Sequence, residues 1–267
     1  NSQIKEYTLQ NYDQNTNCDK ILKKCQIRIK LNQKFNQPVY IFYEISNFSQ
    51  QNRVFMKSRS DLQLQGEYVS DSKLRKQCSP AITNKDLGKT EQYFFEGQNL
   101  NQEDIAYPCG LIAKYFFNDN YQIYDLQNKN KQISIQKTDI VWPSDLEHKY
   151  KINKKELDKY WYDTLDENFI EWMKPSSFSS FRKIWGKINQ DLNQGEYDIL
   201  IDDFWNTQFF KGHKSLLLST KDIFGGKNIF LQYAFIVVGF IQILLSLVLF
   251  VKIMRTDKNF IQISGDK

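Results

Sequence analysis

Histidine is scarce in this chain, with two among 267 residues. Its charge changes most readily near neutral pH, so little is left for acid–base catalysis. The sequence also lacks a G-x-x-x-x-G-K-S/T phosphate loop, a G-x-S-x-G nucleophile turn and an H-E-x-x-H zinc helix. These absences do not exclude an enzyme, but they favour a binding or assembly role.

Carboxylates and thiols in catalytic or metal-binding arrangements are missing as well. Asp202 and Asp203 are adjacent, but neighbouring acids usually lie solvated on a loop, and no second pair joins them. The cysteines lack the close spacing of zinc ligands and lie far in sequence from His148 and His213. We therefore predict no catalytic residue, no metal site and no cofactor.

Charge of one sign is not concentrated anywhere. The chain has 36 Lys and Arg against 31 Asp and Glu, a net charge of +5. Acidic residues interrupt the basic ones, as in KINKKELDKYWYDTLDE, which indicates a mixed solvated surface and no nucleic-acid partner. A content of 15% aromatic residues is typical of a folded protein.

One long apolar run stands out against this polar background. Residues 229–251 are 23 residues without a charge, enough to cross a bilayer core of roughly 30 Å as a helix. A buried helix of a soluble protein rarely needs this length, so we predict a membrane span. Gln242, near its middle, either bonds to its own backbone or contacts a neighbouring transmembrane helix.

Basic residues directly after the span predict its orientation. Lys252, Arg255 and Lys258 follow the apolar run, and the positive-inside rule places residues 252–267 in the cytosol. Residues 1–228 then form one lumenal or extracellular domain.

Four cysteines, all before the span, predict two disulfides in an oxidising compartment. They are Cys18, Cys25, Cys78 and Cys109. Four cysteines allow three connectivities, of which sequential pairing is the simplest. A bond between Cys78 and Cys109 would close a loop of about 30 residues, worth roughly 3.5 kcal/mol in the chain-entropy model.

One glycosylation sequon, Asn47-Phe48-Ser49, agrees with that compartment. One such triplet is expected by chance in a chain this rich in asparagine, so it adds little weight. Asn47 is nevertheless a glycosylation candidate.

Alternating apolar and polar residues predict strands throughout the first domain. The expected strands fall at 26–48 (two strands separated by Pro38), 53–59, 122–126, 131–142 and 214–220. The polar QNKN between the third and fourth of these segments indicates a hairpin. Residues 61–68 run through Gly66 into a turn.

Two segments have apolar residues at helical spacing. The first, 167–174, ends at Pro175, which cannot continue a helix. The second, 179–192, has Phe181, Ile184, Trp185 and Ile188 at that spacing. Strands without long alternating helices predict a mainly β fold: an antiparallel β-sandwich with short helices, followed by one transmembrane helix.

Five segments together resemble a known family. In order along the chain they are NFSQQNRVFMKSRSDLQLQG, YPCGLIAKYFFND, VWPSD, DENFIEWMKPSSFSSFRKIWGKI and GGKNIFLQYAFIVVG. With these cysteine positions, the chain resembles the accessory (beta) subunits of type-IV P-type ATPase phospholipid flippases, the ligand-effect-modulator or cell-division-cycle fifty family. The resemblance extends from about Cys18 to the end of the span.

This resemblance implies two transmembrane helices around a glycosylated, disulfide-bonded lumenal domain, with both chain ends in the cytosol. The first of those helices would precede Asn1 and is absent from these residues. The implied role is non-catalytic: the subunit binds the ATPase, escorts it out of the endoplasmic reticulum and is needed for phospholipid transport. It would reside among the lipids of the endoplasmic reticulum, Golgi, endosome or plasma membrane.

The resemblance also implies roles for individual residues. Cys18–Cys25 and Cys78–Cys109 match the two disulfide positions of the family. Asn47 matches a family asparagine, although the serine that completes the sequon is a departure.

We predict that two groups of residues contact the ATPase. They are Gln232, Gly239 and Gln242 in the span, and Arg53, Lys57, Arg59 and Asp61 in the lumenal domain. The second group is a dense polar run, which would equally fit a solvated edge strand with internal salt bridges. An alternative function is a single-span receptor or adhesion ectodomain that binds an extracellular ligand.

Overall fold

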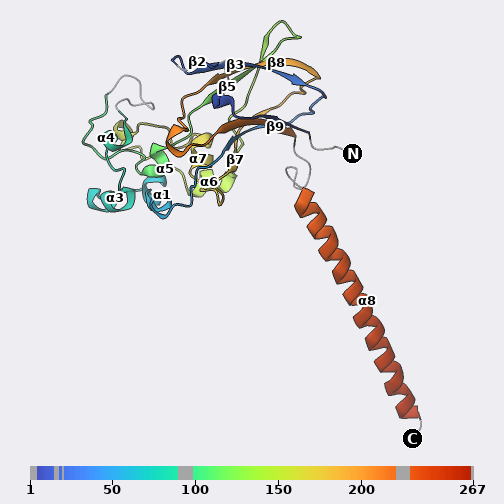
Figure 1. Ribbon diagram of the computed structural model, residues 1–267. Helices are drawn as coiled ribbons and strands as arrows, with labels where there is room; N and C mark the ends of the chain where they lie inside the picture. The colour runs from blue at the N-terminus through green and yellow to red at the C-terminus, as the bar shows by residue number, and fades with distance from the viewer. Residues whose placement is uncertain (1–4, 15–17, 20, 90–98, 221–228, 266–267) are drawn as a thin grey trace. The chain divides into compact units, whose positions relative to one another are not determined.

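The computed structural model describes residues 5–14, 18–19, 21–89, 99–220 and 229–265. The chain divides into two compact units, residues 1–222 and 223–267. The first is mainly β with short helices, and the second is one long helix (Figure 1).

Two antiparallel sheets form two layers in the first unit (Figure 1). One sheet has the strand order β1-β9-β4-β7, with bounds β1 Glu6–Leu9, β9 Lys214–Thr220, β4 Val39–Ile45 and β7 Phe181–Ile188. The other has the order β2-β3-β8-β5-β6, with bounds β2 Cys18–Asp19, β3 Lys24–Leu31, β8 Gly195–Asp202, β5 Asn120–Asp125 and β6 Lys131–Ile133.

Alternating apolar residues place the core between these layers. The buried set of β3 is Cys25, Ile27, Ile29 and Leu31, and that of β4 is Val39, Ile41, Tyr43 and Ile45. β9 is buried from Lys214 to Ser219 because it lies inside its sheet, between β1 and β4. β1 pairs with it from Glu6 opposite Ser219 to Leu9 opposite Leu216.

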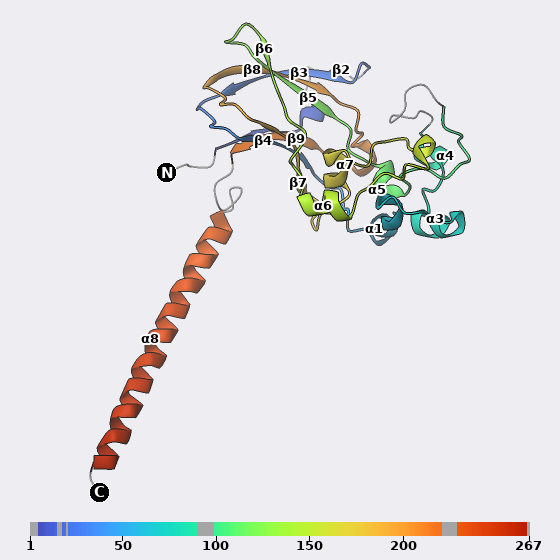
Figure 2. The ribbon, with the colours of Figure 1, turned by 180° about the vertical axis from the view of Figure 1, so that it is seen from behind.

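Short helices gather beyond one end of the sheets (Figure 2). The α-helices are α1 Arg53–Lys57, α2 Asp61–Leu64, α3 Asp71–Cys78, α4 Asn84–Leu87, α5 Leu111–Lys114, α6 Pro143–His148 and α7 Glu167–Trp172. The 3-10 helices are η1 Tyr12–Gln14, η2 Leu157–Lys159 and η3 Gln208–Phe210.

Most of the predicted elements are confirmed. β3 and β4 lie on either side of Pro38, β9 spans the predicted residues, and α7 ends before Pro175. β5 and β6 pair as the expected antiparallel hairpin, although β6 ends at Ile133. Gly66 makes the expected turn, with a φ of +73°.

Residues 53–59 were predicted as a strand, but they form α1 and the turn after it. Asn52 caps this helix: its Oδ1 accepts hydrogen bonds from Val54 N at 2.9 Å and Phe55 N at 3.3 Å. The cap satisfies helix-start amides that have no partner inside the helix. Phe55 is buried between exposed Val54 and Met56, a pattern that a short helix shares with a strand.

Residues 179–192 were predicted as a helix, but they contain strand β7, which pairs with β4 from Phe181 to Ile188. The register places Ile41 opposite Gly186 and the next residue, Phe42, opposite Ile184. Trp185 is therefore the extra residue of a β-bulge. This one-residue insertion breaks the period-two alternation and produces the spacing of three and four that imitates a helix.

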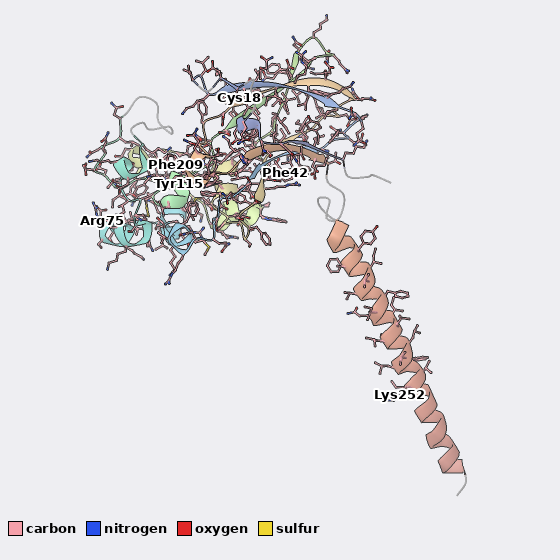
Figure 3. The ribbon with its side chains drawn as sticks, in the orientation of Figure 1. Cys18, Phe42, Arg75, Tyr115, Phe209 and Lys252 are labelled. Atoms are coloured by element: carbon pink, nitrogen blue, oxygen red, sulfur yellow. A yellow bond between two sulfur atoms is a disulfide. The ribbon has the colours of Figure 1, made fainter. Side chains whose placement is uncertain are left out.

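The second unit is α8, Ile229–Gly265. Within it, the 21 residues Tyr233–Ile253 have a mean hydropathy of 2.8 and are long and apolar enough to cross a membrane. The predicted span is thus found as a helix, which continues past residue 251 through the basic residues. Lys252, labelled in Figure 3, lies one residue before the end of this stretch.

Candidate functional site

The polar run predicted to contact a partner, residues 53–61, consists of α1 and the turn that leads into α2. We call this segment the elbow. Arg53 and Lys57 are exposed, and neither side chain makes an ion pair within the described residues. Arg59 instead serves the fold: its Nη1 donates to Met173 O at 2.9 Å, and its Nε lies 2.9 Å from Asp61 Oδ1. The internal salt bridge considered from the sequence is present, which leaves Arg53 and Lys57 open to a partner.

Two buried polar side chains join this elbow to the segment that carries the last cysteine. Ser58 Oγ donates to Cys78 O at 2.7 Å and accepts from Leu111 N at 2.9 Å. Gln63 Oε1 accepts from Cys109 N at 2.9 Å. Losing either side chain would leave buried backbone groups without partners, so these bonds hold the elbow in place.

Gly110 lies at the closest approach between these segments. Its φ is +105°, and a Cβ at this position would lie 2.0 Å from Ser58 O. Glycine meets both requirements because it tolerates positive φ and has no side chain. The turn that positions the elbow therefore depends on this residue.

Two disulfides lie in the first unit, one near its amino end and one in the middle of its sequence. Cys18 (labelled in Figure 3) is bonded to Cys25, its direct cross-strand partner on β3. Cys78, at the end of α3, is bonded to Cys109. These are the two pairs that the family resemblance implies, and no cysteine is free.

Tryptophans converge on one stretch of backbone, residues 107–119, which we call the carbonyl segment. Four of the five indole N–H groups donate to it: Trp161 to Pro108 O at 2.7 Å, Trp172 to Ile112 O at 2.8 Å, Trp205 to Tyr115 O at 3.0 Å and Trp185 to Asp119 O at 3.2 Å. The fifth, Trp142, is 73% exposed. The segment thus connects α7, β7 and the loop after β8.

A buried ion cluster closes the far end of the carbonyl segment. Lys214 is 0% exposed, and its Nζ lies 2.5 Å from Asp119 Oδ2 and contacts Asp203 Oδ1. Tyr12 OH donates to the same Asp119 oxygen at 2.7 Å. Burial raises the pKa of Asp119, and the Lys214 ammonium opposes that shift. One ammonium thus serves two carboxylates, and its removal would leave the buried Asp119 without its cation.

On α8, small and polar residues share one face. Gly239, Gln242 and Ser246 follow one another at spacings of three and four, which places them on the same side of a helix. Gln242 is exposed, and no described atom lies within 4 Å of a Cβ built on Gly239. Position 232 lies seven residues before Gly239, but the side chain of Gln232 is outside the described residues.

The described residues do not assemble a catalytic or metal-binding set. Within them, no three His, Cys, Asp or Glu side chains are grouped to hold a metal ion. Asp203 is committed to Lys214, so it does not act with Asp202. In a hollow of about 690 Å³, His213 Nδ1 lies 3.9 Å from Asp13 Oδ2, and Thr207 Oγ1 donates to the same Asp13 oxygen at 2.9 Å.

Comparison with known protein families matches residues 2–259 to the LEM3 (ligand-effect modulator 3) family, also described as the CDC50 family. This chain belongs to the LEM3/CDC50 family. The resemblance noted in the five sequence segments is therefore confirmed.

Curated LEM3/CDC50 relatives match most of the chain. ALA-interacting subunit 3 of Arabidopsis thaliana is 36% identical over 239 residues, 84% of this chain and 62% of the relative. Cell cycle control protein 50A of Mus musculus is 30% identical over 262 residues, 85% of this chain and 67% of the relative. The chain spans 62% and 64% of the length of the first two plant relatives.

The glycosylation candidate of this LEM3/CDC50 chain lies beside η3. Asn47 is exposed, and its Nδ2 donates to Phe210 O at 2.5 Å. Nδ2 is the atom that would carry a glycan, so modification would have to accommodate this bond. Its glycosylation stays a prediction.

Sequence reasoning missed several residues that position these features. Ser246 completes the helix face of Gly239 and Gln242, and a check of spacing along the span would have found it. Lys214 precedes an apolar run, which is a weak signal for a buried ammonium. The role of the carbonyl segment left no side-chain signal, because its hydrogen-bonding atoms belong to the backbone.

Proposed function

We propose that this chain is the non-catalytic accessory subunit of a phospholipid-translocating P-type ATPase. The observation that carries the proposal is family membership along residues 2–259, with relatives that are themselves named as interacting subunits. Family membership also favours this role over a receptor or adhesion ectodomain. In this proposal the ATPase supplies the ATP-driven chemistry and the lipid path, and the subunit supports assembly, exit from the endoplasmic reticulum and transport.

The proposed orientation follows from charge and redox chemistry. The apolar stretch Tyr233–Ile253 crosses a membrane of the secretory pathway or cell surface, and the basic residues after it stay in the cytosol. The β unit then lies in the lumen or outside the cell, where its two disulfides form and persist.

Two surfaces are proposed to contact the ATPase. One is the elbow, where Arg53 and Lys57 offer unpaired positive charge to an acidic partner surface. The other is the α8 face, where Gly239 lets a partner helix approach closely. Gln242 offers a side-chain amide on that face, and an interhelical hydrogen bond in a membrane contributes about 0.6–2 kcal/mol. Gln232 is included in the proposal from its position in the sequence alone.

Co-purification tests the proposal. The full-length protein, tagged and extracted from its own membranes in a mild detergent, is expected to retain a P-type ATPase that mass spectrometry identifies. Arg53→Glu with Lys57→Glu should weaken that retention, whereas Lys73→Glu with Lys76→Glu, on exposed positions of α3, should not. Recovery of the intact protein without any P-type ATPase would contradict the role, and recovery of an extracellular ligand instead would support a receptor.

A further inference from the structure

Lys214 brings its charge into the core against two carboxylates. Its side chain and that of Asp119 are both sealed from solvent, and the side chain of Asp203 is 23% exposed. Lys214 Nζ lies 2.5 Å from Asp119 Oδ2 and 2.6 Å from Trp205 O, and it contacts Asp203 Oδ1. We propose that Lys214 and Asp119 condense to an isopeptide bond, an amide between Nζ and Cγ, with release of one water molecule. The accessory role proposed above does not depend on this bond.

The condensation balances without any further reactant. Lys214 Nζ passes one proton to Asp119 Oδ2, which leaves a neutral amine beside a neutral carboxylic acid. The amine attacks Cγ, and Asp203 carries a second proton from Nζ to Oδ2. The Cγ–Oδ2 bond then breaks, Oδ2 departs as water, and Asp203 is a carboxylate again. The chain modifies itself once, so the reaction needs neither turnover nor an external substrate.

The groups around Asp119 prepare its carboxyl for this attack. Burial raises the pKa of Asp119, which favours the neutral acid that the reaction requires. Trp205 N donates to Oδ1 at 2.6 Å, where a backbone amide stabilises negative charge that develops on that oxygen. Tyr12 OH donates at 2.7 Å to Oδ2, the oxygen that leaves. Both carboxyl oxygens are therefore bonded to donors that assist the reaction.

The product suits the buried site better than the ion pair does. Taking an ammonium and a carboxylate out of water carries a large desolvation cost, and the amide replaces both charges by a neutral group. The charge that remains is on Asp203, the acid with access to solvent. Trp205 supplies partners for both amide atoms, its N for Oδ1 and its O for the Nζ–H group. Tyr12 OH loses Oδ2 as a partner but keeps Tyr121 OH at 2.8 Å.

The fold brings the reacting groups together and gives the released water an exit. Lys214 and Asp119 are 95 residues apart in the sequence, and holding them in contact removes much of the entropic barrier to their reaction. Asp203 and Trp205 line the hollow of about 690 Å³, into which the water can pass. The bond joins β9 to the end of the carbonyl segment, and reducing agents that cleave the two disulfides leave it intact.

Peptide mapping of the full-length protein, unfolded and reduced before trypsin digestion, tests for the bond. Trypsin cleaves after free lysine, so the isopeptide protects residues 212–221 from cleavage at Lys214 and joins them to residues 115–129. We expect this linked pair, with a mass one water molecule below the sum of its two peptides. Fragmentation should place the link between Lys214 and Asp119. Recovery of residues 115–129 only in unlinked form, with cleavage after Lys214, would show an ion pair and overturn the proposal.

Variants test the role of each group. Lys214→Arg keeps the positive charge but removes the amine, so it should abolish the linked pair. Asp203→Asn removes the proton carrier and should lower the linked fraction, at a fixed time after synthesis, at least about tenfold. Asp202→Asn is the matched control and should leave that fraction unchanged, because Asp202 Oδ2 accepts from Asn120 Nδ2 at 3.3 Å instead.

Two results with these variants would overturn the proposed chemistry. One is a linked pair that persists in Lys214→Arg, and the other is an unchanged linked fraction in Asp203→Asn. If a variant does not fold, the peptide map of the unchanged protein still decides whether the bond exists.

Discussion

Lys214 and Asp119 form an ion pair that is sealed from solvent on both sides, with 2.5 Å between Nζ and Oδ2. Lys214 belongs to the strand at the centre of one sheet, and Asp119 ends the carbonyl segment. The pair therefore fastens the β layers to the part of the chain on which the tryptophans converge.

Removing the ammonium should destabilise the fold strongly. Lys214→Ala leaves the buried Asp119 and the partly exposed Asp203 without their cation, and breaking a buried pair by removing one partner costs about 3–5 kcal/mol. Lys73→Ala, at an exposed position of α3, should change the free energy of unfolding by less than about 0.5 kcal/mol. Chemical denaturation of both variants measures the difference, and equal stabilities would contradict a structural role for the cluster.

Gly110 offers a sharper comparison, because Gly88 shares its positive φ without its crowding. Gly110→Ala places a Cβ 2.0 Å from Ser58 O and should prevent the native turn. Gly88→Ala meets no atom within 4 Å and should cost about 1–2 kcal/mol, the backbone penalty alone. Thermal unfolding and expression level report the two outcomes. Similar behaviour of the two variants would show that the close approach at Gly110 is not required.

The hydrogen bonds to the carbonyl segment can be tested one indole at a time. Trp172→Phe removes the donor to Ile112 O, and an unsatisfied buried carbonyl costs about 1–3 kcal/mol in addition to the lost packing. Trp142→Phe, at an exposed position, is the matched control and should be nearly neutral. If the denaturant midpoints of both variants shift equally, the hydrogen bond from Trp172 to the carbonyl segment does not contribute to stability.

Lys183 should make stability depend on pH in the alkaline range. Burial lowers its pKa to about 8 in the folded protein, against 10.5 for an exposed lysine. Between these values the unfolded chain binds the proton and the folded chain does not, so the free energy of unfolding rises as pH increases from 8 to 10.5. The rise is up to about 3 kcal/mol.

Lys183→Met provides the control for this pH effect. Other lysines and tyrosines titrate in the same range, so the informative quantity is the difference between the unchanged protein and the variant. The free energy of unfolding of the unchanged protein should increase relative to that of the variant from pH 8 to 10.5, and the difference between them should stay constant below pH 8. A pH-independent difference would mean that the folded pKa of Lys183 is not lowered.

The position of Gln242 on the same face of α8 as Gly239 predicts that its amide contacts the ATPase. Gln242→Leu should reduce the amount of ATPase that co-purifies, because the amide is lost from the face shared with Gly239. Adding Leu244→Gln to that variant restores the polarity of the helix but places the amide on the opposite side. It should therefore not restore co-purification, and full recovery would show that polarity alone matters.

The sequence predicted the layers of the fold better than its irregular parts. Alternation identified β3 and β4 because each has one regular period. β9 forms at the predicted residues but is buried along nearly its whole length. β7 was missed because the extra residue Trp185 interrupts that period. α1 was missed because its stability depends on a cap from Asn52 rather than on its own short apolar pattern.

The candidate surfaces were only partly predictable for similar reasons. Arg53 and Lys57 are exposed, but Arg59 donates to the backbone oxygen of Met173. A contact with a backbone atom cannot be predicted from the pattern of side chains. The family resemblance implied both cysteine pairs. It gave no indication of the buried ion cluster, whose members come from segments far apart in the chain.

The pairing of β1 with β9 has a consequence for biosynthesis. Synthesis proceeds from the amino end, so Glu6–Leu9 emerges long before the strand that it must join. Its partner residues, Leu216–Ser219, are made shortly before α8. The first sheet can therefore close only when translation of the whole first unit is nearly complete. A chain truncated before residue 214 would leave β1 without its partner strand and β4 without one of its two neighbours.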